Sequence, residues 1–367
     1  MEEAVRKKER NSWIEILRLI AMLMIFFHHA VLHGGTSFYG TLDFQDFIRE
    51  CMYHGGKLGV IIYVLLSGYN LYSSKLTLKK VIKFIIEIYL FNIALFIYYQ
   101  TTSQYKITSN IHKILLFPFS NNQYWFISLY LLILLGSPLF NIAINNITKS
   151  QHIITITVLF LLTSLLPSLY SFSTYTQEIL IFVLFYFMGA FLKKYPLKDL
   201  KGYKFLFLGG AIIIYLYMNY LIIYFGSDLH SKKIVNRFIE FVNSSVSILI
   251  ASLLVIFFTQ LKPIRSKVIN FLSCGTLEIY LLHDSIFTRY KVFHLVYDGA
   301  KIPYSSTWAL EFFFSNLIRF LAILLICIAI KQIYTFTICK GIDLIDKRII
   351  EYRNNKKKEL EEKKDSD

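Results

Sequence analysis

The stretch "RLIAMLMIFFHH", residues 18–29, is an apolar run with an arginine at one end and two histidines at the other. In an α-helix, eleven steps of about 100° make three turns plus roughly 20°, so Arg18 and His29 share one face about 16 Å apart. Ionisable groups at such depth in a membrane are costly and usually face the bundle interior or a water-filled cavity. The alternative is structural, with Arg18 extended to lipid phosphates and His29 hydrogen-bonded at the interface.

The whole chain has the apolar character of this stretch. Of its 367 residues, 55% are hydrophobic and 17% are charged, and the mean hydropathy is +0.51. These values exceed those of ordinary soluble domains, so we expect an all-α integral membrane protein, a bundle of about ten transmembrane helices. The predicted helices lie near residues 13–32, 56–74, 81–100, 124–142, 153–170, 176–192, 204–225, 239–259, 268–287 and 308–330.

Lysine and arginine gather in short clusters at the ends of the apolar segments. Placing both termini in the cytoplasm puts most of these residues on the cytoplasmic side, as the positive-inside rule requires. The formal net charge of +15 follows from this topology, so we expect no nucleic-acid partner. The predicted organisation is a basic cytoplasmic N-terminus (1–12), a membrane domain (13–330), and a charged cytoplasmic helix and tail (331–367) near anionic lipids.

The residue types that bind metals are scattered along the chain. Cys51, Cys274, Cys327 and Cys339 show no C-x-x-C spacing, and no acidic or cysteine ligands accompany the histidines at useful intervals. We therefore predict packing cysteines, no disulfide framework and no metal site.

Four stretches are informative together because of their order along the chain. They are "IEILRLIAMLMIFFHH" (14–29), "GVIIYVLLSGY" (59–69), "YWFISLYLLILLGSPLF" (124–140) and "LEIYLLHDSIF" (277–287). In this order they resemble the acyltransferase family 3 integral-membrane enzymes, which acylate sugars and other surface acceptors. The resemblance implies a membrane O-acyltransferase of the surface-polysaccharide acetyltransferase type, located in the bacterial cytoplasmic membrane. We expect no appended extracytoplasmic esterase-like domain, although many relatives carry one.

The chain departs from that family after the second helix. Relatives often have an Arg-x-x-Arg pair there, whereas "LKKVIKF" supplies Lys80 and Lys83. A lysine meets a phosphate as a point charge and lacks the bidentate fork of arginine. We expect Arg18, Lys80 and Lys83 to hold the phosphates of acyl-CoA, a co-substrate and not a permanently bound cofactor. For the two lysines, ordinary positive charge on a cytoplasmic loop is the alternative.

His29 is the candidate catalytic group, because only imidazole titrates near neutral pH without large perturbation. It would act as general base on the acceptor hydroxyl or become acylated itself, and the sequence leaves both routes open. Glu15 precedes Arg18 by three positions, so the two side chains can pair on one helix face.

Four further residues are candidates for supporting the site. Ser67 ends the second helix, where a small residue also favours close packing, and Trp125 begins the fourth, where it stacks on a sugar or anchors the helix. The resemblance places Tyr280 and His283 near the site, although an interfacial belt also contains such residues. The adjacent His283, Asp284 and Ser285 diverge by about 100° each on a helix, which excludes a catalytic triad made of them.

Glu278 and Arg319 are charges inside the ninth and tenth predicted helices. Antiparallel packing would bring them to similar depth, and either charge alone in lipid is costly. The sequence therefore predicts an intramembrane ion pair between them.

The predicted function is O-acyl transfer, in particular O-acetyl transfer, from cytoplasmic acyl-CoA to a hydroxyl of a cell-surface glycan or glycolipid. The alternatives are a glycan export or transport component and a non-catalytic sensor or resistance module. No second helix repeats the arginine-to-histidine spacing and no paired broken helices are visible, which argues against transport.

Overall fold

The structure, a computed structural model, describes residues 10–34, 43–104, 106–107, 111–119, 124–170, 177–197, 200–226, 228–294 and 307–364. Within these ranges the chain is helical and contains no strand. The helices are α1 (Ser12–His33), α2 (Phe44–Leu71), α3 (Leu78–Thr102), α4 (Ile111–Leu116), α5 (Trp125–Asn146), α6 (Lys149–Phe160), α7 (Leu166–Tyr170), α8 (Gln177–Lys194), α9 (Lys204–Tyr224), α10 (Leu229–Ile239), α11 (Ser245–Thr259), α12 (Lys267–Leu272), α13 (Thr276–His283), α14 (Arg289–His294), α15 (Trp308–Tyr334) and α16 (Lys340–Lys364). Short 3₁₀ or π turns connect some of them: η1 (Leu161–Leu165), η2 (Lys201–Tyr203), η3 (Ser273–Gly275) and η4 (Thr335–Cys339).

The all-helical membrane fold is confirmed. Each of the ten predicted segments overlaps one helix or a run of consecutive helices, although several boundaries differ. By length and composition, 6 stretches of the described chain can cross a membrane: Ser12–His33, Leu78–Thr102, Trp125–Asn146, Lys149–Tyr170, Lys201–Tyr224 and Trp308–Lys356. A count of about ten spans and the side of the termini stay predictions. Most of the predicted N-terminal segment (1–9) and the last residues of the tail (365–367) lie outside the described ranges.

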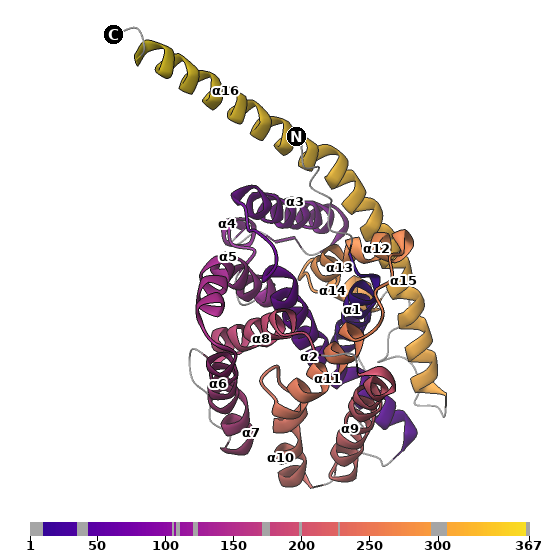
Figure 1. The fold of residues 1–367 in the computed structure, drawn as a ribbon. Coiled ribbons are helices and arrows are strands. Elements are labelled where there is room, and N and C mark those ends of the chain that lie inside the picture. Colours follow the sequence, from indigo (N-terminus) through magenta and orange to yellow (C-terminus); the bar gives the residue numbers. More distant parts are fainter. Residues whose placement is uncertain are drawn as a thin grey trace.

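Two helices form the centre of the bundle. α1 lies along α2, and α8, α9 and α11 pack against other faces of α2, while α13 and α15 contact α1 (Figure 1). Leu17 and Ala21 of α1 and Ile61 and Leu65 of α2 are fully buried between these helices. This arrangement places the decisive apolar run of α1 in the protein interior.

The start of α1 is fixed by hydrogen bonds to the segment that leads into α12. The Asn11 side chain caps the helix by accepting from the Trp13 backbone N–H at 3.1 Å. The Ser12 N–H donates to the Ile264 carbonyl at 2.9 Å, and the Ser12 hydroxyl donates to Asn270 Oδ1 at 3.0 Å. These bonds bring the first turns of α1 beside η3 and the start of α13.

Helix α2 begins at Phe44, well before the predicted start at residue 56. The Asp43 side chain caps it, and its first turns bury the polar residues Asp46, Glu50 and His54. His54 Nδ1 lies 3.0 Å from Asn219 Oδ1 of α9, so these polar groups have partners within the protein. A hydropathy pattern counts such residues against a membrane helix, which explains the late predicted start.

Helices α2 and α8 approach closely because glycines face each other's backbone. A Cβ on Gly68 would lie 2.4 Å from the Tyr186 carbonyl oxygen, and one on Gly189 would lie 2.1 Å from the Leu65 carbonyl oxygen. Neither backbone can move away without shifting its helix. The close packing expected where the second helix ends is therefore present.

The last helix continues from α15 through η4 into α16, which projects beyond the bundle (Figure 1). Ion pairs connect its beginning to α3, among them Lys79 Nζ with Asp346 Oδ2 at 2.8 Å and Lys83 Nζ with Asp343 Oδ1 at 2.7 Å. Both pairs are partly exposed, so each stabilises the contact only modestly.

Candidate functional site

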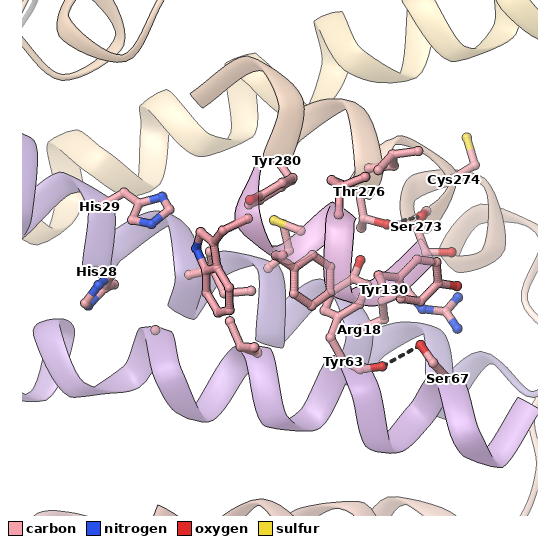
Figure 2. Close-up of a pocket in the computed structure, with 18 of the residues that line it drawn as sticks. Arg18, His28, His29, Tyr63, Ser67, Tyr130, Ser273, Cys274, Thr276 and Tyr280 are labelled. Atoms are coloured by element: carbon pink, nitrogen blue, oxygen red, sulfur yellow. Dashed lines mark hydrogen bonds between the residues drawn. The ribbon is translucent and has the colours of Figure 1, made fainter. Parts of the chain in front are cut away.

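A cavity of about 380 Å³ lies between α1, α2, α3, α5, the η3–α13 segment and α15. Arg18 borders it toward one end and His29 toward the other, with Tyr280 between them (Figure 2). Met22 and Ile25 also line it, as expected from their position on the helix face that Arg18 and His29 share. The arginine and the imidazole thus face one protein-lined space.

Arg18 is held by a short chain of polar contacts. Its Nη1 donates to Glu15 Oε2 at 2.5 Å, and the Ser273 hydroxyl donates to the same oxygen at 2.7 Å. Glu15 is buried, so its carboxylate is shielded from water and keeps the guanidinium in one orientation. The predicted pairing of Glu15 with Arg18 is confirmed.

Three further cations line the cavity together with Arg18: Arg10, Lys331 and Lys57, which follows Gly56, the glycine that packs against His28. Arg10 immediately precedes the α1 cap, and Lys331 belongs to the last turn of α15. Lys331 has a sequence signal, since it is the first charge after the tenth apolar run. No sequence pattern predicts Arg10 at the cavity, because its position there depends on the packing of the start of α1 beside η3.

Lys331 also contacts two acidic side chains. Its Nζ donates to Glu87 Oε1 of α3 and lies 3.1 Å from Glu278 Oε1 of α13. Glu278 is 1% exposed, so the lysine supplies positive charge to a carboxylate that is shielded from water.

The predicted ion pair between Glu278 and Arg319 is wrong. Arg319 Nη1 donates instead to Asn316 Oδ1 at 2.9 Å on its own helix. The prediction assumed one continuous helix over 268–287, whereas η3 interrupts it and Glu278 falls in the first turn of α13. Gly275 lies beside Ile328, so this turn is level with the end of α15, where Lys331 is found.

Lys80 and Lys83 do not line the cavity. The Lys80 ammonium donates to the Lys75 carbonyl oxygen at 2.7 Å, and Lys83 pairs with Asp343 of α16. Their position on α3 directs both side chains to the end of the bundle from which α16 extends. The structure thus brings Arg10 and Lys331 to Arg18, and it does not bring the two lysines there.

Both histidines at the end of the apolar run line the cavity. His28 Nδ1 lies 2.5 Å from the Tyr53 carbonyl oxygen, so one of its ring nitrogens already has a partner. A Cβ on Gly56 would lie 2.2 Å from His28 Cβ, so only glycine allows α2 to pass this close to the ring.

His29 faces Asp284, an acidic residue that is not among the predicted site residues. His29 Nδ1 lies 3.8 Å from Asp284 Oδ1, at the end of α13. Arg289 Nη2 donates to the same carboxylate oxygen at 2.7 Å. His283 Nδ1 lies 2.6 Å from the Ile279 carbonyl oxygen, so His283 and Asp284 turn to different partners and form no relay with each other.

The other predicted supporting residues take different positions. Ser67 and Trp125 line the cavity, where the Ser67 hydroxyl donates to the Tyr63 carbonyl oxygen at 2.7 Å and Lys57 Nζ lies 5.6 Å from the Trp125 ring centre. Tyr280 also lines it, while His283 stands behind His29 with a ring-centre distance of 5.0 Å.

Two tyrosine hydroxyls of the cavity wall have only poorly aligned partners, Thr276 for Tyr63 and Asp284 for Tyr280. Those of Tyr63 and Tyr280 are buried, and neither makes a hydrogen bond of ordinary geometry to a described residue. Buried hydroxyls are normally hydrogen-bonded, so these two are suited to a polar guest. Tyr63 precedes Ser67 by one helical turn, a spacing that places both on the cavity face.

The start of α5 is fixed by Tyr124, the residue before its first turn. Tyr124 has a left-handed backbone, with φ of 55°, and its buried hydroxyl donates to the Leu281 carbonyl oxygen of α13 at 2.8 Å. This contact connects α5 to α13 and sets the direction in which Trp125 and Phe126 enter the cavity wall.

Among the described residues, no three His, Cys, Asp or Glu side chains are grouped so that they could hold a metal ion. The chemistry available at this site is that of an imidazole, a carboxylate, hydroxyls and several fixed cations.

Comparison with known proteins gives one match. A family model described as "Acyltransferase domain" covers residues 11–335, which includes both ends of the cavity. No curated protein and no solved structure matches the chain.

Proposed function

We propose that this chain, which belongs to the acyltransferase family whose model covers residues 11–335, moves an acyl group through its cavity. The donor is acyl-CoA in the cytoplasm, acetyl-CoA in our prediction, and the acceptor is a hydroxyl of a cell-surface glycan or glycolipid. The chain would work in the bacterial cytoplasmic membrane with both termini in the cytoplasm. The observation that supports this proposal is the shared cavity, with Arg10, Arg18 and Lys331 toward one end and His29, near Lys57, toward the other.

The Arg18 end suits the donor. Arg10, Arg18 and Lys331 line this part of the cavity wall, and guanidinium and ammonium groups form strong, charge-assisted hydrogen bonds with phosphates. Glu15 and Ser273 hold Arg18 in place, which lowers the cost of ordering it when a phosphate binds. Lys80 and Lys83 would contribute only long-range positive charge.

The middle of the cavity suits the arm that carries the acyl group. About 380 Å³ is within the usual range for small-molecule sites, roughly 300–1,000 Å³. The buried hydroxyls of Tyr63 and Tyr280, whose hydrogen bonds within the protein are poorly aligned, would donate to carbonyl oxygens of the arm or of the thioester.

His29 would perform the proton transfer at the acceptor end. As general base, it takes the proton of the attacking hydroxyl while that oxygen bonds to the thioester carbonyl carbon; the C–S bond then breaks, and the proton passes to the leaving thiolate. In the covalent route, the imidazole attacks first and the C–S bond breaks, so the thiolate leaves and takes a proton from water; the acceptor hydroxyl then displaces the acyl group from the cationic ring and gives its own proton to water. Trp125 would provide a stacking surface for a sugar ring.

The test uses purified protein in lipid vesicles with labelled acetyl-CoA and candidate surface glycans. We expect His29→Ala to lower product formation at least about 100-fold, since proton transfer contributes that much or more. His230→Ala is the matched control, because His230 is exposed on α10 and far along the chain from the cavity residues. Full activity of folded His29→Ala would refute the assignment.

The same assay separates the two routes and the rival functions. Label that stays on wild-type protein without acceptor indicates the covalent route, and its absence indicates general base catalysis. A transport component or a non-catalytic module would leave every acceptor unlabelled.

A further inference from the structure

We propose that Asp284 is a positioning residue for His29: its carboxylate accepts the Nδ1 proton of His29, and Arg289 holds that carboxylate in place. This inference rests on the proposed function, in which a ring nitrogen of His29 reacts with the hydroxyl proton or with the acyl group. It assigns roles to Asp284, which lies in the stretch 277–287, and to Arg289 at the start of α14, neither of which is a site residue predicted from the sequence.

The first argument is geometric. His29 Nδ1 is buried and makes no hydrogen bond to a described residue, and Asp284 Oδ1 lies 3.8 Å away. A shift of about 1 Å would bring these atoms to hydrogen-bond distance. If Nδ1 faces Asp284, then Nε2 is the nitrogen left for an acceptor hydroxyl or an acyl group in the cavity.

The carboxylate is itself well held. Asp284 is 4% exposed, and its backbone N–H donates to the Tyr280 carbonyl oxygen at 3.0 Å. Arg289 Nη2 donates both to Asp284 Oδ1 and to the Asp284 carbonyl oxygen, each at 2.7 Å. The arginine therefore offsets the cost of burying the charge and limits the orientations of the carboxylate.

The other groups around His29 are less suited to accept its Nδ1 proton. The rings of His28, His33 and His283 have their centres 5.4, 5.7 and 5.0 Å from that of His29. His28 and His283 donate Nδ1–H to the carbonyl oxygens of Tyr53 and Ile279, which leaves each Nε2 as a neutral acceptor, and a neutral imidazole nitrogen is a weaker acceptor than a carboxylate. Arg289 can only donate.

The proposed contact serves either chemical route. With the proton on Nδ1, Nε2 carries the lone pair that removes the hydroxyl proton or attacks the thioester carbon. Once Nε2 has bonded to a proton or an acyl carbon, the ring is cationic, and the carboxylate beside Nδ1 stabilises it. Asp284 exchanges no proton with the substrate in either route.

The decisive experiment measures kcat and the KM for acetyl-CoA with an acceptor that the wild-type protein acetylates. For Asp284→Asn we expect kcat to fall at least about 100-fold while KM stays within about twofold, because the substituted residue does not bind the donor. In the double variant His29→Ala/Asp284→Asn, we expect kcat no lower than in His29→Ala alone, since Asp284 acts through His29.

Three controls complete the experiment. Asp228→Asn, at the exposed start of α10, should keep wild-type kcat. Thermal unfolding of each variant reports its folding. Should Asp284→Asn not fold, Asp284→Glu keeps the charge that Arg289 pairs with but moves the carboxylate, and we expect its kcat to fall about 10-fold with KM unchanged.

The outcomes separate the two proposals. Wild-type kcat in folded Asp284→Asn or Asp284→Glu would overturn the role of Asp284, and so would a further loss of kcat in the double variant. Lack of any transfer by wild-type protein would overturn the proposed function instead.

Discussion

At the scale of single residues, Lys331 has an unusual position, because it touches two buried carboxylates from different helices. Glu87 belongs to α3 and Glu278 to α13, so one ammonium group connects three helices. Removing the cation would leave two acidic groups near each other with little access to water. Such a loss is costly, since each carboxylate then lacks its compensating charge.

We expect Lys331→Met to lower the stability of the folded protein by about 3 kcal/mol, the lower end of what breaking a buried ion pair costs. Thermal unfolding of the purified protein in detergent measures this loss. Lys347→Met is the matched control, because Lys347 is exposed on α16 and its contact with Glu351, at 3.8 Å, contributes little. Equal unfolding temperatures for the two variants would contradict the importance of the buried contact.

Whether a site residue could be predicted from the sequence depends on how far apart in the chain its contacts lie. Arg18, His29 and Glu15 lie on one helix, so helical geometry alone predicted that they share a face, and the structure confirms it. The neighbours Asp284 and Lys331 come from distant parts of the chain, and no pattern within one helix indicates them. Glu278 pairs with Lys331 and not with the predicted Arg319, because η3 changes the depth of Glu278 in the bundle.

At the scale of helices, the centre of the bundle depends on close approach between α2 and α8. A Cβ on Gly189 would meet backbone atoms of α2, the Leu65 carbonyl oxygen at 2.1 Å and the Tyr69 nitrogen at 2.8 Å. Backbone cannot rotate away as a side chain can. Any larger residue must therefore separate the two helices.

We expect Gly189→Ala to destabilise the protein by about 1–3 kcal/mol, as overpacking of a well-packed core does. Gly209→Ala is the matched control, since nothing lies within 4 Å of the added Cβ on α9. Replacing that glycine should be neutral or stabilise the helix by up to about 1 kcal/mol. Thermal unfolding of both variants measures the difference, and an equal response would count against the close contact.

The helices themselves were largely predictable, because long apolar runs leave few alternatives to an α-helix in lipid. Two boundaries were not. Helix α2 starts with polar residues that are buried against other helices, and the predicted ninth helix is split into α12, η3 and α13. Both features depend on packing partners from elsewhere in the chain, and hydropathy contains no information about them.

At the scale of the whole molecule, the proposed direction of acyl transfer requires the Arg18 end of the cavity to face the cytoplasm. α16 continues from the same end of α15 as Lys331, so the C-terminus should lie on that side. We expect green fluorescent protein fused after residue 367 to fluoresce in bacteria, as it does in the cytoplasm. A fusion truncated after Gly226, predicted to end outside, should be dark. The reverse result would contradict the orientation.

The cavity wall draws on both ends of the chain: Arg10 stands before the first helix, and Lys331 belongs to the last long apolar one. During synthesis, Arg10 is among the first residues to be made and Lys331 among the last. A chain that ends before α15 therefore lacks part of the cavity wall, including Lys331. In the proposed function, such a chain would transfer no acyl group until its last long helix is in place.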